Sequence, residues 1–122
     1  MKKSLWAVII SAIVAVPSLA SAGYHYSSPV VINATSFAGT LHATRNTADN
    51  VSYLGCGVVS STTGDFLLCH ARTTTDSRSC MSSDPGLIAN VRSITSSSYI
   101  SVTHSGSTCT AISVVHLSYH LP

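Results

Sequence analysis

The chain has 122 residues, and its six Lys and Arg against four Asp give a formal net charge of +2 at pH 7. Lys2 and Lys3 account for that charge, because the rest of the chain carries four arginines, four aspartates and no lysine or glutamate. A nearly neutral surface argues against binding to nucleic acid or an anionic membrane, which needs clustered Lys and Arg.

The first 22 residues have the pattern of a bacterial secretory signal peptide. In order, they provide a positive n-region, an apolar h-region, a proline break and a small-residue cleavage site: Lys2 and Lys3, residues 5–16, Pro17, and Ala20-Ser21-Ala22. A membrane anchor is the alternative, but the apolar run is about a dozen residues and a span needs roughly 20. The sequence therefore predicts export to the periplasm or beyond, removal of residues 1–22, and one domain over residues 23–122.

The exported part begins with a series of short predicted strands. A β-branched run indicates a buried strand over residues 29–34, and alternating apolar and polar positions indicate a second strand over residues 37–44. A polar loop over residues 45–52 follows. Three further strands are expected over residues 53–60, 65–72 and 78–81, joined by turns rich in Ser, Thr and Gly.

One later segment has helix signals. Ser83 or Asp84 can cap its start, Pro85 suits the first helical position, and an apolar stripe follows, which together predict a helix over residues 85–94. A strand over residues 97–104, a tight turn and a long strand over residues 108–121 complete the chain. The elements predict an α+β fold: a mainly antiparallel sheet, made of a meander plus a C-terminal hairpin, with one short helix packed on it.

All four cysteines lie in the exported part, which favours two disulfide bonds formed in an oxidising compartment. In a meander, Cys56 and Cys80 would both face Cys69 across neighbouring strands. Four cysteines allow three pairings and the sequence does not choose among them. We favour Cys69–Cys80 with Cys56–Cys109, because the second bond would tie the terminal hairpin to the meander. The wide spacing of the cysteines is unlike the close pairs of zinc sites.

The exported part also contains six histidines, the residue type with most potential as metal ligands. His116 and His120 share a face of the last predicted strand. His25 can join them from the N-terminus, and so can His42 or His104 if the fold places them nearby. Because four strand residues span about 13 Å, His116 and His120 cannot hold one ion on a strand. We therefore expect no metal site, with His116, His120 and His25 as the weak candidates for one.

Two further chemical patterns are weak. Residues 66–70, Phe-Leu-Leu-Cys-His, resemble a single-cysteine haem-attachment motif. A disulfide cysteine beside a surface histidine is the simpler explanation of this pattern. No Gly-x-Ser-x-Gly motif and no closely spaced pair of acidic residues is present. We therefore expect no cofactor, no catalytic residues and no enzymatic activity.

Several short motifs occur together along the exported part: Tyr53-Leu54-Gly55-Cys56, Cys69-His70-Ala71-Arg72, Ser79-Cys80, Ser83-Asp84-Pro85, Ser98-Tyr99-Ile100 and Cys109-Thr110. In this combination the chain resembles a set of small exported proteobacterial proteins of unknown function with a four-cysteine framework. The resemblance implies a domain family and no particular activity.

Export, disulfide bonds and a neutral surface without a recognisable catalytic site favour a non-enzymatic role. The sequence predicts a secreted or periplasmic domain with a structural, surface-associated or protein-interaction role, whose partner is another protein or a surface. Two alternatives stay open: a periplasmic histidine-based metal or haem-binding protein, and a small secreted inhibitor or effector.

Overall fold

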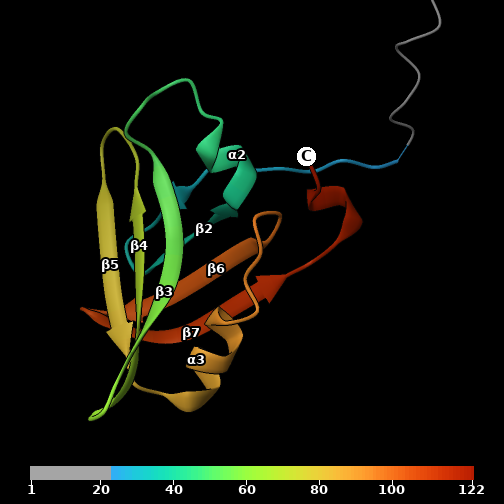
Figure 1. Ribbon diagram of the computed structural model, residues 1–122. Coiled ribbons are helices and arrows are strands. Elements are labelled where there is room, and N and C mark those ends of the chain that lie inside the picture. The colour runs from blue at the N-terminus through green and yellow to red at the C-terminus, as the bar shows by residue number, and fades with distance from the viewer. Residues whose placement is uncertain (1–22) are drawn as a thin grey trace, which may run out of the picture.

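The computed structural model describes residues 23–122 (Figure 1), so the predicted signal peptide lies outside the described residues. The strands, in chain order, are β1 (Val31–Ile32), β2 (Ser36–Thr40), β3 (Tyr53–Ser61), β4 (Gly64–Arg72), β5 (Ser77–Ser82), β6 (Tyr99–Ser105) and β7 (Thr108–Val115). The helical segments are α2 (Leu41–Arg45), α3 (Pro85–Val91) and the 3-10 turn η3 (Ser118–His120).

All seven strands belong to one sheet, in the order β1-β2-β6-β7-β5-β4-β3. Neighbouring strands are antiparallel except β5 and β7, which are parallel where Met81 lies beside Thr108. The sheet is therefore mixed. The prediction of a largely β-structured domain with little helix and two disulfide bonds is confirmed in this coarser form.

Strands β3, β4 and β5 form the predicted meander, and β6 and β7 form the predicted C-terminal hairpin. The β3–β4 turn ends at Gly64, whose φ of 133° lies in the region that favours glycine. Helix α3 begins as predicted, because the Asp84 carboxylate accepts the N–H of Leu87 at 3.0 Å and Pro85 follows it. It ends at Val91, three residues before the predicted end.

Two strands are shorter in the structure than predicted, because both pair with β6 and each ends where β6 begins. The expected strand over residues 37–44 leaves the sheet after Thr40, which pairs with Tyr99 at the first position of β6. The chain continues as α2, where the Thr44 hydroxyl donates to the Thr40 carbonyl at 2.9 Å. The expected strand over residues 108–121 stops at Val115 for the same reason, since Val115 also pairs with Tyr99.

The expected buried strand over residues 29–34 is instead a two-residue edge strand. Val30 is buried, but Val31 is 53% exposed, because successive side chains of an extended chain point to opposite faces. The β-branched run therefore contributes one core residue.

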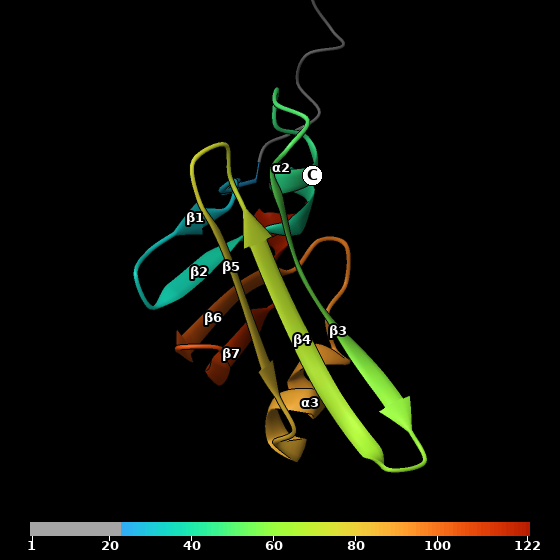
Figure 2. The ribbon, with the colours of Figure 1, turned by 90° about the vertical axis from the view of Figure 1, so that its left-hand side faces the viewer.

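The sheet curls so that the β3–β5 meander crosses in front of β6 and β7 (Figure 2). The core lies inside this curl, and α3 packs against β7, β4 and β3 and contributes Ile88 and Val91 to the core. The other buried core residues come from the N-terminal segment and from five strands: Val30, Phe37, Leu67, Cys69, Ala71, Cys80, Val102, Cys109 and Ile112. Burial of this apolar surface is the main force that holds the curl closed.

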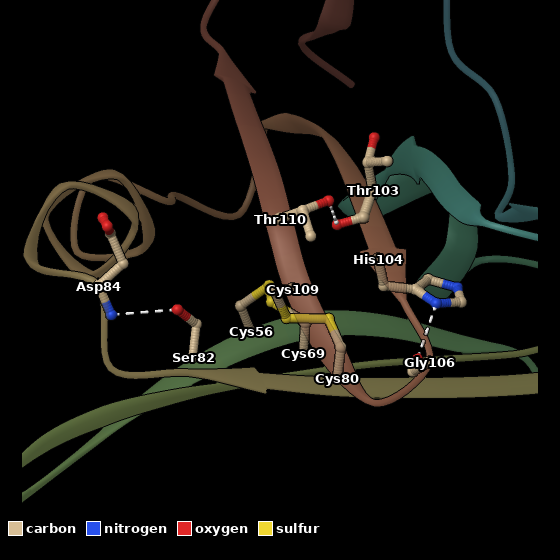
Figure 3. The surroundings of a disulfide bond; sticks show 10 residues. All are labelled: Cys56, Cys69, Cys80, Ser82, Asp84, Thr103, His104, Gly106, Cys109 and Thr110. Atoms are coloured by element: carbon tan, nitrogen blue, oxygen red, sulfur yellow. Dashed lines mark hydrogen bonds between the residues drawn. A yellow bond between two sulfur atoms is a disulfide. The ribbon is translucent and has the colours of Figure 1, made fainter.

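The disulfide bonds are Cys56–Cys69 and Cys80–Cys109, so the favoured pairing was wrong (Figure 3). Cys69 does face both Cys56 and Cys80 in the register, as predicted. The strand order decides between them: β5 lies beside β7, whereas β3 is three strands away from β7. Cys80 is thus the cysteine next to Cys109, and Cys56 is left with Cys69.

Candidate interaction surface

Strand β3 is the longer of the two sheet edges, with nine residues against two in β1. Its sequence, Tyr-Leu-Gly-Cys-Gly-Val-Val-Ser-Ser, contains no charged residue and no proline. Edge strands of soluble proteins usually carry charges, prolines or bulges that prevent pairing with another chain. Strand β3 has neither charge nor proline, and its register with β4 is continuous over all nine residues.

The disulfide bond shows which backbone groups of β3 face the free edge. The Cα atoms of Cys56 and Cys69 are 4.0 Å apart, a separation that belongs to a non-hydrogen-bonded antiparallel pair. The N–H and C=O of Cys56 therefore point away from β4. Because this direction alternates along a strand, the backbone groups of Leu54, Val58 and Ser60 point to the free edge as well. Within residues 23–122, none of these groups has a hydrogen-bond partner on another element.

Beside this edge, the outer face of the meander carries an apolar outer patch, which consists of Val59, Phe66, Leu68 and Met81. Val59 lies opposite Phe66, and Leu68 lies opposite Met81, so the four side chains are continuous across three strands. Val59 and Met81 are each 47% exposed. Phe66 and Leu68 between them are half-buried. Contiguous apolar side chains with exposed members beside an open edge are typical of protein-interaction surfaces.

The sequence analysis did not identify this surface. One signal was available in β4, where Phe66, Leu67 and Leu68 are consecutive apolar residues and thus occupy both faces of the strand. The structure places Leu67 in the core and the other two outside.

The turn that leads into β3 is fixed by Asp49. Its carboxylate accepts the backbone N–H groups of Ser52 at 2.6 Å and Val51 at 2.8 Å, and the Ser52 hydroxyl at 2.9 Å. These hydrogen bonds hold the pKa of Asp49 below its ordinary value, and the bond from the Ser52 N–H has the largest effect. The start of the free edge is therefore held in place by a charged turn.

The two ends of the described chain are fastened to each other. The Tyr26 N–H donates to the Tyr119 carbonyl at 2.7 Å, and His120 Nδ1–H donates to the Tyr26 carbonyl at 3.0 Å. His120 is only 3% exposed and stacks on Tyr99, with ring centroids 5.2 Å apart. His42 Nε2–H donates to the His120 carbonyl. The role of His120 here is to hold the two chain ends together.

The three candidate metal ligands have different environments. His120 is occupied as described, and His116 Nδ1 lies 3.0 Å from the Ser98 hydroxyl. His25 is exposed and makes no side-chain hydrogen bond within residues 23–122, and its ring centroid lies 6.4 Å from that of His42. The fold thus brings His25 toward His42, one of the two further histidines that the sequence offered.

Cysteine chemistry is accounted for by the disulfide bonds. The sulfur atoms of Cys69, Cys80 and Cys109 lie within 4.8 Å of one another, a spacing that could place three ligands around one metal ion. All three belong to disulfide bonds, so none offers a thiolate. The haem-like motif likewise lacks a free thiol, because Cys69 is bonded to Cys56.

Comparison with protein-family models, curated proteins and solved structures found no match to this chain. The resemblance to exported four-cysteine proteins therefore stays a prediction. Among residues 23–122, no helix has the length and apolar character needed to cross a membrane.

Proposed function

We propose that this protein is an exported, non-enzymatic interaction domain that pairs edge to edge, through β3, with a second copy of itself. The uncharged nine-residue edge of β3 carries this proposal. Addition of a strand to such an edge uses main-chain hydrogen bonds for affinity and nearby side chains for specificity.

The sequence of β3 suits pairing with itself. In an antiparallel arrangement about a two-fold axis at Gly57, Cys56 lies opposite Val58 and Leu54 lies opposite Ser60. These four are the residues whose backbone groups point outward, so the hydrogen bonds of the two copies match. Gly57 sits at the axis, where a Cβ would meet no atom within 4 Å. One patch meeting itself gives a closed dimer rather than a filament.

Two observations support the exported part of the proposal. Two disulfide bonds are compatible with an oxidising compartment. The first 22 residues have the composition of a signal peptide. A near-neutral surface, with four arginines and four aspartates over residues 23–122, also lets two copies approach without net repulsion.

A charge placed on the edge tests the proposal. We expect the exported protein to be a dimer by light scattering and Gly57→Lys to be monomeric at the same concentration, because a lysine at the axis brings two like charges together. The matched control is Thr74→Lys, which adds the same charge to the exposed β4–β5 turn and should stay dimeric. A wild-type protein that is monomeric at every concentration reached, or a Gly57→Lys variant that dimerises like wild type, contradicts the proposal.

A further inference from the structure

We infer that the processed N-terminus of this protein, Gly23-Tyr24-His25, binds one Cu²⁺ or Ni²⁺ ion in a square-planar site of four nitrogen atoms. The inference rests on the exported part of the proposed function, because the site exists only when cleavage after Ala22 frees the amine of Gly23. It does not depend on the pairing of β3.

The ligands follow from the position of histidine as third residue. The free amine of Gly23, the backbone nitrogens of Tyr24 and His25, and Nδ1 of the His25 ring can close fused chelate rings around one ion. Square-planar nitrogen coordination is the geometry that Cu²⁺ and Ni²⁺ favour. Binding displaces the two amide protons and the proton of the amine, where it is protonated, and no electron is transferred.

The structure leaves these particular groups free. Gly23, Tyr24 and His25 are exposed, and within residues 23–122 the N–H groups of Tyr24 and His25 have no hydrogen-bond acceptor. The fold first holds the chain at the next residue, where the Tyr26 N–H donates to Tyr119. The chain is therefore fastened immediately after the third ligand residue, and wrapping residues 23–25 around an ion breaks no hydrogen bond of the fold.

A neighbouring histidine is positioned to add an axial ligand. His42 donates through Nε2–H to the His120 carbonyl, which leaves its Nδ1 as the nitrogen with a free lone pair. The ring of His42 lies 6.4 Å from that of His25. His25 also lines an open hollow of about 810 Å³, whose other lining residues come from the two chain ends. The ion would thus be accessible to small ligands from solvent.

The experiment is a titration of the exported protein, purified after expression of the full chain, with Cu²⁺ at neutral pH. We expect one equivalent to bind, with the absorption and electron paramagnetic resonance signals of a four-nitrogen tetragonal site. In the pH range where the Gly23 amine is protonated, the apparent affinity for Cu²⁺ should fall about a thousandfold for each unit by which the pH is lowered. The reason is that three protons compete with the ion. Zn²⁺, which prefers tetrahedral sites, should not displace Cu²⁺.

A pair of substitutions separates this site from ordinary histidine binding. Tyr24→Pro removes one amide proton and keeps His25, so it should abolish the four-nitrogen signal, whereas Tyr24→Ala should retain it. Neither change should affect folding, because Tyr24 is 75% exposed. His42→Ala should change the spectrum without loss of stoichiometric binding.

Mass spectrometry of the same sample distinguishes the possible failures. An N-terminus other than Gly23 overturns both this inference and the predicted processing. A Gly23 N-terminus without the four-nitrogen signal, or with equal signals from Tyr24→Pro and Tyr24→Ala, overturns the metal site alone and leaves export and pairing in place.

Discussion

Gly39 lies in β2 at a point where the N-terminal segment crosses it closely. A Cβ at this position would lie 2.9 Å from the Cα of Val30 and 3.1 Å from the carbonyl oxygen of Ser28, and both of these atoms are backbone. The contact is part of the attachment of the N-terminal segment, since the Thr40 N–H donates to the same Ser28 carbonyl at 2.8 Å. Glycine is therefore required here for close approach.

We predict that Gly39→Ala lowers the free energy of unfolding by about 1–3 kcal/mol, because two backbone segments must separate. The control is Gly55→Ala in β3, where a Cβ meets no atom within 4 Å. That change should be neutral or stabilise by up to about 1 kcal/mol through the unfolded chain. Urea unfolding of the two variants measures the difference, and equal effects would show that the segment does not pack as described.

At the scale of single residues, the sequence was informative where the signal is local. The helix start at Asp84 and Pro85 was predicted because the capping carboxylate of Asp84 and the N–H group that donates to it, from Leu87, are three residues apart. The backbone groups of β3 that point to the free edge were not predicted. Their direction follows from the Cα distance between Cys56 and Cys69, which only the structure provides. The sequence named both His42 and His104 as histidines that could join His25 and could not choose between them, because β1 and β2 separate His25 from His42 in the chain.

At the scale of elements, the two disulfide bonds close loops of different length. Cys56–Cys69 spans 13 residues within one hairpin, whereas Cys80–Cys109 spans 29 residues and joins β5 to β7 across the parallel junction. Restriction of the unfolded chain grows with loop length. The longer bond also has both cysteines buried.

We therefore predict that replacing Cys80 and Cys109 by alanine costs more stability than replacing Cys56 and Cys69. Loop length alone accounts for a difference of about 0.7 kcal/mol, and each bond contributes about 2–4 kcal/mol. Denaturant unfolding of the two double variants measures the order. If the Cys56/Cys69 variant proves the less stable, loop closure is not the dominant contribution of these bonds.

The order of strands in the sheet determines the disulfide pairing and the strand ends, which could not be predicted from the sequence. Strand positions were predicted well within the meander, because period-2 alternation and Ser/Thr/Gly turns are local signals. Which cysteines pair, and where the strands beginning at Ser36 and Thr108 end, depend on which strand lies alongside. Strand β6 begins at Tyr99, and this one boundary ends both β2 and β7.

At the scale of the whole molecule, the curled sheet separates two surfaces. One is the free edge of β3 with the apolar outer patch, and the other is the junction of the chain ends with its histidines. The proposed dimer uses the first and the proposed metal site uses the second. The two proposals can therefore be tested independently in the same protein.

A largely β-structured domain and the meander were predictable, but the parallel pairing of β5 with β7 and the interaction surface were not. An edge is a property of strand order, and β3 reads as an ordinary strand in the sequence. Only the strand order shows that the uncharged strand β3 lies at the edge of the sheet. Only the register shows that Val59, Phe66, Leu68 and Met81 meet on the outer face of the meander.

Amide hydrogen exchange along β3 tests the central claim most directly. The outward N–H groups of Cys56 and Val58 should exchange slowly in concentrated protein and quickly on dilution, because pairing with a second copy protects them. The N–H of Gly57, which bonds to β4 in either state, should remain equally protected at both concentrations and serves as the internal reference. Rapid exchange of Cys56 and Val58 at every concentration would contradict pairing through this edge.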